Sequence, residues 1–384
     1  MKKICFITTV AVTLESFVVE TAINLHKTEG YDITLICNND ENFEGSLPEF
    51  IHFIPVKMGR GINLYGFSSI FTFYKIFKKH KFDLVQYSTP NASCYASIAS
   101  FLARVPVRLY AQWGIRYVGL NGLSRKIFKS IEKIVCKLST HIRAVSKKNM
   151  QFAIDEKLYK KEKAAVIGNG GTIGVDMLDY NIESKEIWRS QVRSKLNFAE
   201  DDFIFGFVGR ISVDKGCSEL LNAFKHISND YKSAKLLIIG PDENSGIDPQ
   251  LLNWAQQSSS VIFTDEIRKN DMKLYYSAID VLVHPTYREG FGMVIQEAGA
   301  LAVPTITTDI PGASEVMENN VSCLLIQPKS SSELEEAMCL LLQDNAKMRS
   351  LGKGAYKRTK ELYDRPIMLE HQRIEYKKLL DGEN

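Results

Sequence analysis

The chain has 384 residues, a formal net charge of +3, and 45% hydrophobic residues with aromatic side chains throughout. This length exceeds what one hydrophobic core usually supports, and it predicts two domains of roughly 180 residues each. The composition excludes a disordered chain, and apolar runs no longer than a strand exclude the roughly 20-residue span of a membrane helix.

The first half of the chain alternates short apolar runs with amphipathic segments. Its first run, KICFITT, follows a charged start like that of a signal peptide, but threonines and Glu15 interrupt the pattern and no cleavage site follows. We therefore interpret this run as a buried strand. The amphipathic pattern predicts long helices at 65–81 and 123–139. Further strands are expected at 31–37, 51–56, 82–88, 107–113 and 141–146.

The second half repeats this architecture. Near-continuous apolar strands between helices predict an α/β protein with two doubly wound, Rossmann-like domains, each a parallel sheet covered on both faces. Ligands are then expected at the carboxyl ends of the strands, in a cleft that the two domains face. The expected strands are 202–209, 234–240, 260–265, 280–285, 303–309 and 322–328, and the expected helices include 217–227, 271–279 and 291–301.

A polar stretch at 181–202 separates the halves and is predicted to be the linker. We therefore expect an N-terminal domain at 1–185 and a C-terminal domain at 186–365. The tail predicts two helices that are broken near Asp364 to Pro366, because a proline starts one helix while ending the one before it.

The segment FGFVGRISVDKG, at 205–216, ends the first strand of the second domain. Gly209 lets the chain turn sharply beside a ligand. Arg210 and Lys215 place two cations near the N-terminus of a helix that is expected to start at about Gly216. Two cations and the positive end of a helix suit a diphosphate, whereas the alternative is that both are ordinary surface cations.

The segment REGFGMVIQEAGA, at 288–300, follows another expected strand. Gly290 and Gly292 let backbone N–H groups approach a ligand at the N-terminus of the next helix. We expect Glu289 to accept hydrogen bonds from sugar hydroxyls, and Glu297, two turns into the helix, to accept them from a ribose diol. The alternative for Glu297 is a local cap or ion pair.

Two more loops belong to the same predicted sheet edge. The segment TTDIPGASEVM, at 307–317, has a Pro-Gly turn and Glu315 in the helix that follows. Its backbone is expected to line the cleft, although a structural turn explains it equally well. The loop at 264–272 is positioned to meet a nucleotide base.

Charge is distributed unevenly along the chain. Between Lys57 and Lys163 there are 21 Lys and Arg residues against five acidic residues, a net charge of +16. Such a surface attracts anionic lipid or a phosphate-bearing substrate, or it is only a solvated surface. Because no nucleic-acid module is present, we expect no nucleic-acid partner.

The seven cysteines and seven histidines show no ligand spacing, so neither a disulfide framework nor a metal site is predicted. We expect free thiols that pack in the core. The cysteines are Cys5, Cys37, Cys94, Cys136, Cys217, Cys323 and Cys339.

The combination of GRISVDKG, HPTYREGFGMVIQEAGALAVPTITTDIPGASEVM and the later LLIQP resembles retaining glycosyltransferase family 4, whose fold is called GT-B. The resemblance covers most of the chain and is most specific in the second half. Within the family, the sequence is most similar to bacterial enzymes that assemble capsule and O-antigen repeat units. The resemblance implies an acceptor-binding first domain, a donor-binding second domain, and a last helix, 366–384, that crosses back to the first domain.

Carried over residue by residue, the resemblance implies catalytic roles for Arg210, Lys215 and Glu289, with Trp113 as a further catalytic candidate, and binding roles for these and neighbouring residues. It implies no cofactor and no metal, and a reaction that retains the anomeric configuration while the leaving diphosphate helps to deprotonate the acceptor. The implied contacts are Arg210 and Lys215 to the nucleotide diphosphate, Glu289 to hydroxyls of the transferred sugar, the backbone of Phe291, Gly292 and Met293 to that sugar and the phosphates, and Glu297 to the donor ribose.

The first domain departs from the family pattern in RLYAQWGIRYVG. Relatives commonly have a histidine immediately before the glycine, where this chain has Trp113 preceded by Gln112. We take these two side chains as candidates for a contact with the sugar, with core packing as the alternative. Arg116 is then expected to meet the acceptor diphosphate.

The resemblance implies a glycosyltransferase that moves a hexose or N-acetylhexosamine to a polyprenyl-diphosphate-linked oligosaccharide at the cytoplasmic face of the bacterial membrane. UDP is the expected nucleotide and GDP-mannose the alternative donor. The basic first half suits peripheral contact with anionic lipid.

The rival hypotheses are a nucleotide-sugar epimerase of similar fold and an inactive sugar-nucleotide-binding subunit. A dehydrogenase is disfavoured because no G-x-G-x-x-G follows either first strand.

Overall fold

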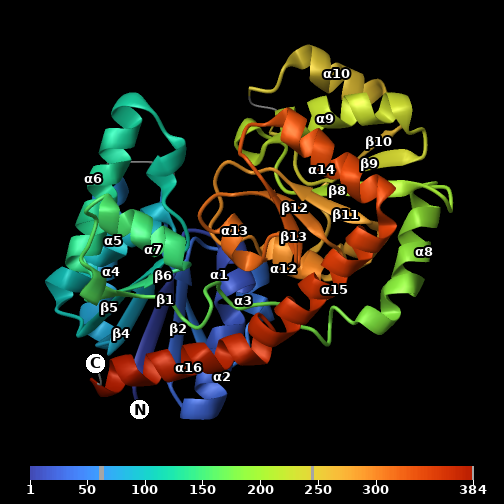
Figure 1. The fold of residues 1–384 in the computed structure, drawn as a ribbon. Coiled ribbons are helices and arrows are strands. Elements are labelled where there is room, and N and C mark those ends of the chain that lie inside the picture. Colours follow the sequence, from blue (N-terminus) through green and yellow to red (C-terminus); the bar gives the residue numbers. More distant parts are fainter. Residues whose placement is uncertain (60–64, 244–245, 383–384) are drawn as a thin grey trace. The chain divides into compact units, whose positions relative to one another are not determined.

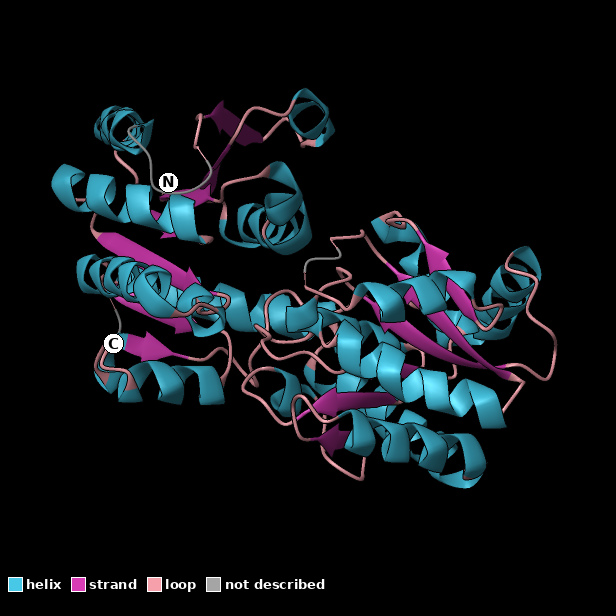
Figure 2. Cartoon of the chain, turned by 90° about the horizontal axis from the view of Figure 1, so that it is seen from above, coloured by secondary structure: helices cyan, strands magenta, loops and turns pink. Residues whose placement is uncertain are grey.

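The computed structural model describes residues 1–59, 65–243 and 246–382, and the chain divides into two compact units. Unit 1 comprises Met1–Ile173 and Pro366–Asn384, and unit 2 comprises Gly174–Arg365. Each unit is a parallel sheet with helices on both faces (Figures 1 and 2). This arrangement follows from the alternation of apolar strands with amphipathic helices.

Unit 1 has a seven-stranded parallel sheet in the order β3-β2-β1-β4-β5-β6-β7. The predicted strands are all present, while β7, which has only two residues, was not predicted. The strands are β1 (Lys3–Ile7), β2 (Asp32–Cys37), β3 (Ile51–Pro55), β4 (Leu84–Tyr87), β5 (Val107–Gln112), β6 (His141–Ala144) and β7 (Ala164–Ala165).

Two hydrophobic clusters bury the two faces of this sheet. On one face pack α4 (Tyr65–His80), α5 (Pro90–Ala103), α6 (Gly122–Leu138) and α7 (Lys147–Asp155). On the other face pack α1 (Ala11–Phe17), α2 (Val19–Glu29), α3 (Glu41–Ser46) and α16 (Arg365–Asp381).

Unit 2 has a six-stranded parallel sheet in the order β10-β9-β8-β11-β12-β13. Every predicted strand of the second half is present. The strands are β8 (Phe203–Val208), β9 (Ala234–Ile239), β10 (Val261–Thr264), β11 (Val281–His284), β12 (Thr305–Thr308) and β13 (Cys323–Ile326). The helices are α8 (Lys185–Lys195), α9 (Cys217–Asp230), α10 (Pro249–Gln257), α11 (Met272–Ala278), α12 (Met293–Ala300), α13 (Ala313–Val316), α14 (Ser331–Gln343) and α15 (Asn345–Leu362).

The strand order of unit 2 reverses between β8 and β11. The chain builds outward from β8 to β10 and then returns to place β11 on the opposite side of β8. The loops that follow β8 and β11 therefore run in opposite directions at the carboxyl edge of the sheet, which is where doubly wound sheets bind ligands. These loops contain the two motifs that the sequence singled out, at 209–216 and 285–292.

The polar stretch at 181–202 corrects the expected domain boundary. It is not a free linker, because half of it forms α8, which packs on α11 in unit 2. Arg189 and Arg193 of this helix each donate to a different oxygen of Asp280, at 2.6 and 2.7 Å. The boundary therefore follows Ile173, rather than Lys185 as expected from composition.

The last helix, α16, belongs to unit 1, as the resemblance implied. Gln372 donates to the carbonyl of Thr172 at 2.7 Å and accepts from the hydroxyl of Thr21 at 2.7 Å. Tyr376 is fully buried, and its ring contacts Phe6 of the central strand edge-on at 5.7 Å. Residues 383–384 of the predicted last helix lie outside the described residues.

Candidate functional site

The loop after β8 forms a compact turn that leads directly into α9. Gly209 has a φ of +147°, and its N–H donates to the carbonyl of Ile239 at 2.9 Å. Gly216 has a φ of +72°, and a Cβ at this position would lie 2.1 Å from the carbonyl oxygen of Pro285. Only glycine satisfies both conditions. The turn is therefore pressed against the end of β11, and α9 begins at the next residue.

Hydrogen bonds tie the loop after β8 to the loop after β11. The carbonyl of Asp214 accepts from the N–H of Tyr287 at 2.9 Å and from the hydroxyl of Thr286 at 3.3 Å. The carboxylate of Asp214 accepts from Ser212 at 2.6 Å. Burial alone would raise the pKa of Asp214, but this hydrogen bond and the charges of nearby cations lower it. The two motifs are thus one preformed structure.

Two side chains, the predicted Lys215 and the neighbouring His284, meet at Glu289. The ammonium of Lys215 and Nε2 of His284 both lie 2.9 Å from Oε2 of Glu289. The other oxygen, Oε1, accepts from the N–H of Gly290 at 3.0 Å. The structure therefore joins the cation of the first motif to the first acid of the second motif.

The electrostatics of this cluster fix its protonation. Burial would raise the pKa of Glu289, but the charge of Lys215 and the hydrogen bond from His284 hold that pKa far below its usual range. Burial lowers the pKa of His284, which is only 1% exposed. Glu289 is thus ionised and His284 neutral, so Nε2 of the ring carries the hydrogen that it donates to the carboxylate.

His284 is a residue that the sequence analysis missed. It is the last residue of β11, and its carbonyl accepts from the hydroxyl of Thr307 at 2.9 Å. The available signal was its position, because it is the histidine of HPTYREGFG and five residues before Glu289. By itself, a histidine at the end of an apolar strand does not indicate a contact with a carboxylate.

Arg210, the other predicted diphosphate ligand, has carboxylate partners. Its guanidinium lies 2.5 Å from Glu243 and 3.3 Å from Asp214. The side chain is about two-fifths exposed, at 41%. Arg210 therefore stands on the same turn as Lys215, with its charge directed to two acids of unit 2.

The turn before α12 positions backbone rather than side chains. Gly292 caps the helix with a φ of +56°. Phe291 is buried and packs edge-on against Tyr363 at 5.6 Å, so its ring belongs to the core. A Cβ added to Gly312 would lie 2.2 Å from the carbonyl oxygen of Gly290, so the Pro-Gly turn packs closely against this loop. Met293 is the first residue of α12.

Glu297 lies in the second turn of α12 and has its own partners. Its Oε2 accepts from the hydroxyl of Tyr276 at 2.8 Å. Burial raises the pKa of Glu297, although hydrogen bonds from Tyr276 and Tyr180 and the charge of Lys269 act in the opposite direction. Lys269 belongs to the loop that was expected to meet a base. The two tyrosines were not predicted, because nothing in the sequence places them next to this helix.

Glu315 has a structural contact. Its Oε2 accepts from the N–H of Gly312 at 3.2 Å, so the carboxylate caps its own short helix, α13. The Pro-Gly segment is therefore a structural turn that packs on the loop of Gly290.

The candidates in unit 1 fall into two groups. Gln112 is 1% exposed; its amide donates to Glu132 at 2.6 Å, and its carbonyl accepts from Tyr159 at 3.0 Å. The arrangement corrects the expected contact of Gln112 with substrate, because both ends of its amide serve the core. Trp113 is partly buried against Phe17, with ring centroids 5.2 Å apart.

Arg116 lies on the surface, in the 3-10 turn Arg116–Gly119 that follows β5. Its guanidinium carbon lies 5.1 Å from the ring centroid of Phe128 on α6. This cation–π contact places Arg116 beside α6, which carries five of the basic residues of the first half.

The comparisons with known proteins give the family. The sequence matches the model for glycosyl transferases group 1 over residues 189–358 and the glycosyl transferase 4-like model over residues 3–146. The chain belongs to glycosyltransferase family 4. This glycosyltransferase is 29% identical over 360 residues to the capsular polysaccharide biosynthesis glycosyltransferase CapM of Staphylococcus aureus, with 93% of each chain covered.

A second relative and a solved structure agree with this assignment. The glycosyltransferase is 25% identical over 329 residues to the UDP-Gal:alpha-D-GlcNAc-diphosphoundecaprenol alpha-1,3-galactosyltransferase of Escherichia coli, covering 82% of this chain and 81% of the relative. The crystal structure of Anabaena HepE in complex with UDP and glucose has a TM-score of 0.78 at 21% identity, covering 98% and 99% of the chains. The likeness confirms the predicted GT-B fold.

The described residues also bear on the expected absence of a metal and of a membrane span. Within the described ranges, no group of three or more His, Cys, Asp or Glu side chains is arranged to hold a metal ion. The expectation that this glycosyltransferase needs no metal stays a prediction. Among the helices in the described part of the chain, none is both long and apolar enough to cross a membrane.

Proposed function

We propose that the enzyme transfers a hexose or N-acetylhexosamine from a UDP-sugar to a polyprenyl-diphosphate-linked oligosaccharide during assembly of a cell-surface polysaccharide. The observation that carries this proposal is the cluster of Lys215, His284 and Glu289 at the switch point of the unit 2 sheet. The polysaccharide, the UDP-sugar and the lipid diphosphate come from the relatives, since one is a capsular polysaccharide biosynthesis glycosyltransferase of Staphylococcus and the other a UDP-Gal:alpha-D-GlcNAc-diphosphoundecaprenol galactosyltransferase of Escherichia.

The donor contacts follow from the geometry of unit 2. Lys215 and the N-terminus of α9 suit the diphosphate, and Arg210 on the same turn exchanges its carboxylate partners for the second phosphate. Glu289 receives the hydroxyls of the transferred sugar, with the backbone of Gly292 and Met293 beside it. Glu297 accepts the ribose diol next to Tyr276.

The protonation of Glu289 restricts its chemistry. Because its pKa lies far below the usual range, it has no proton to give and acts as a fixed negative charge. A negative charge beside the sugar stabilises an oxocarbenium-like transition state, while Lys215 stabilises the charge that develops on the leaving diphosphate. The leaving phosphate then takes the proton of the acceptor hydroxyl, and the anomeric configuration is retained.

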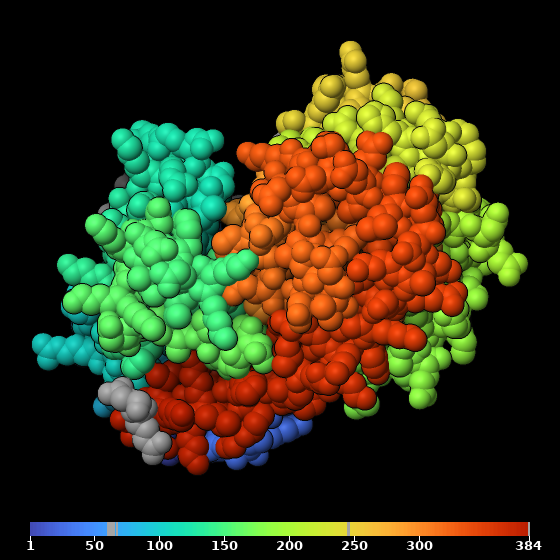
Figure 3. Space-filling view, in the orientation of Figure 1, coloured from blue at the N-terminus to red at the C-terminus, as the bar shows by residue number. Residues whose placement is uncertain are grey.

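The acceptor is assigned to unit 1, where Trp113 and Arg116 follow β5. The helix α6 carries exposed apolar side chains, with Leu123 73% exposed and Ile134 46% exposed, among the lysines at 126, 129, 133 and 137. Atoms of this helix form part of the molecular surface that Figure 3 shows. This mixture of exposed apolar and basic residues suits peripheral contact with the anionic cytoplasmic face of a membrane.

The proposal is tested by finding which nucleotide sugar the enzyme uses as donor. The purified protein is incubated with UDP-glucose, UDP-galactose, their N-acetyl forms or GDP-mannose, with and without a polyprenyl-diphosphate-linked acceptor, and the products are identified by mass spectrometry. We expect one UDP-sugar to give an extended lipid and free UDP, with activity retained in EDTA. Conversion of the nucleotide sugar without acceptor would instead establish an epimerase, and turnover of GDP-mannose alone would correct the donor.

A further inference from the structure

A pocket of about 380 Å³ lies between α5 and α6 of unit 1. This volume falls within the roughly 300–1,000 Å³ of sites that bind small molecules. Its walls are mainly apolar, although one of them is α6, which carries five Lys and Arg residues against one acidic residue. The lining residues are Pro90, Asn91, Cys94, Tyr95, Lys126, Ile127, Phe128, Ser130, Ile131 and Ile134.

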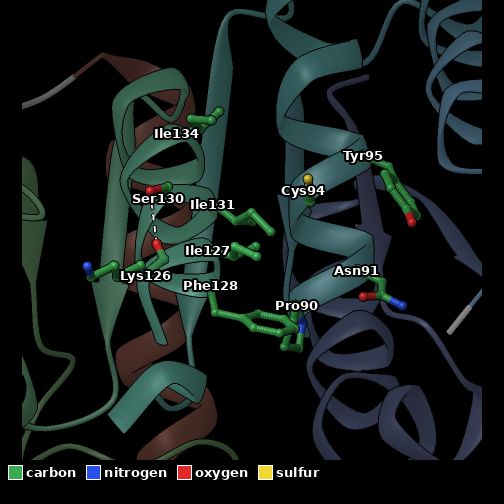
Figure 4. A pocket seen from close by; sticks show the side chains of 10 residues that line it. All are labelled: Pro90, Asn91, Cys94, Tyr95, Lys126, Ile127, Phe128, Ser130, Ile131 and Ile134. Atoms are coloured by element: carbon green, nitrogen blue, oxygen red, sulfur yellow. Dashed lines mark hydrogen bonds between the residues drawn. The ribbon is translucent and has the colours of Figure 1, made fainter. Parts of the chain in front are cut away.

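The side chains converge from two helices. Ile127 and Ile131 of α6 point toward α5, and the ring of Phe128 reaches Pro90 at the start of α5 (Figure 4). Lys126 extends in the opposite direction, away from α5. The pocket thus has a mainly apolar interior formed by branched and cyclic side chains, and the charged end of its one lysine points away from it.

The position of this pocket connects it to the acceptor end of unit 1. Pro90 follows β4, and α6 follows the turn after β5, so both helices start at the carboxyl edge of the sheet. Arg116 lies 5.1 Å over the ring of Phe128, which is itself a pocket wall. A guanidinium next to an apolar pocket is complementary to a diphosphate that carries a hydrocarbon chain.

We infer that this pocket binds the isoprenoid chain of the acceptor lipid next to its diphosphate. The inference rests on the proposed function, which makes a polyprenyl diphosphate the acceptor, and it adds a subsite for the lipid rather than the sugar. Ile127 lines the pocket yet remains 41% exposed, so it leaves apolar surface that an entering chain covers. Burial of isoprenoid methyl and methylene groups there strengthens acceptor binding.

Cys94 gives a direct probe of occupancy that needs no turnover. Among the seven cysteines only Cys94 and Cys339 are not fully buried, and Cys339 lies in unit 2 as an internal reference. Alkylation is followed by peptide mass spectrometry at mildly alkaline pH, because burial raises the pKa of the Cys94 thiol. We expect farnesyl diphosphate to slow alkylation of Cys94 about tenfold or more, without affecting Cys339.

Two control ligands show whether the diphosphate alone or a membrane lipid can account for the protection of Cys94. Inorganic diphosphate and phosphatidylglycerol vesicles, each tested alone, are expected to leave Cys94 reactive. Equal protection by the vesicles would show that the pocket is a membrane contact and would overturn the inference. The same holds if farnesyl diphosphate gives no protection.

A matched pair of variants tests the pocket in turnover. Ile127→Glu places a carboxylate in the lining, whereas Leu123→Glu makes the same charge change on the same helix outside the lining. With detergent-solubilised acceptor, we expect Ile127→Glu to raise the KM for the lipid acceptor at least tenfold more than Leu123→Glu does. UDP should protect the two variants against unfolding to a similar extent. Equal KM values would overturn the inference, whereas a wild-type enzyme that extends no polyprenyl diphosphate would overturn the proposed function.

Discussion

At the scale of single residues, the charge of Glu289 is determined by neighbours from two different strand ends. Lys215 reaches it from the turn after β8, and His284 reaches it from the end of β11. A carboxylate that is 17% exposed remains ionised only because of these contacts. Glu297 is the opposite case, because its partners are neutral tyrosine hydroxyls and burial raises its pKa.

We predict that Glu289→Gln lowers kcat by about 100-fold or more, since in the proposed mechanism it removes the fixed charge next to the reacting sugar. Leaving Lys215 partly buried without its partner should also lower the free energy of unfolding at pH 7 by about 3 kcal/mol. Because the pKa of Glu289 is lowered by folding, this stabilisation is present above the usual pKa of about 4.3 and is lost as pH falls through the folded value.

Denaturant unfolding at pH 7 and at pH 3 measures the stability difference. Glu243→Gln is the control for stability, since it breaks the more exposed ion pair with Arg210. Its cost should stay below about 1 kcal/mol. Activity of Glu289→Gln within a few-fold of wild type would remove Glu289 from the proposed mechanism.

For Glu297→Gln we predict higher stability but weaker binding of the donor. The pKa of Glu297 is raised in the folded protein, so its ionisation at neutral pH opposes folding, and this effect disappears as pH falls below the usual pKa. The amide keeps an acceptor for Tyr276, so the variant should be about 1 kcal/mol more stable at pH 7 and equal to wild type near pH 4. Donor KM should rise about tenfold, because an amide accepts fewer diol hydrogen bonds. Steady-state kinetics and thermal unfolding together check this, and an unchanged KM would contradict the ribose assignment.

At the scale of elements, the site depends on how closely two strand-to-helix loops approach. The turn before α9 touches Pro285 at the end of β11, and the backbone of Asp214 bonds to the loop after β11. The motifs are 69 residues or more apart in sequence, yet the strand order places them side by side. Positive helix ends and the cationic turn are therefore brought together by the sheet.

Gly216→Ala should show this dependence. The alanine would have both a positive φ and a Cβ 2.1 Å from a carbonyl oxygen, so we expect a loss of about 3 kcal/mol or more in unfolding free energy. Gly30→Ala is the matched control, because Gly30 has a similar φ of +67° with no atom within 4 Å of the added Cβ. It should cost only about 1–2 kcal/mol. Equal costs, measured by urea unfolding, would show that the contact with Pro285 is not restrictive.

At the scale of the whole molecule, the chain ends by returning to the unit where it began. Tyr376 is fully buried beside Phe6 and bonds to Gln86, while Arg143 pairs with Glu375. One face of the unit 1 sheet is thus completed by residues that follow all of unit 2 in sequence. The stability of unit 1 therefore depends on the end of the chain.

Tyr376→Ala should destabilise unit 1 by about 3–5 kcal/mol, since it removes a buried ring and its hydrogen bonds. The adjacent and exposed Lys377→Ala should have an effect of about 0.5 kcal/mol or less. Because the proposed nucleotide site lies in unit 2, UDP should still slow hydrogen exchange in unit 2 of the Tyr376 variant. Loss of that UDP protection would show that the two units do not respond separately.

The sequence alone predicted most of the local structure of this glycosyltransferase. Alternating apolar strands and helices give every strand except β7, and both loop motifs fall where the sheet edge later places them. Local periodicity and turn residues determine these features because they act over a few neighbouring positions. The polar composition of 181–202 misled, because polarity does not show that α8 packs on α11.

Contacts between distant segments were decided only by the tertiary structure. The approach of Lys215 and His284 to Glu289, the tyrosines beside Glu297, and the burial of Gln112 against Glu132 each join residues from separate elements. Strand order, rather than spacing in the sequence, sets these distances. A single sequence states which groups are available, whereas the packed sheets determine which of them meet and which protonation state each one holds.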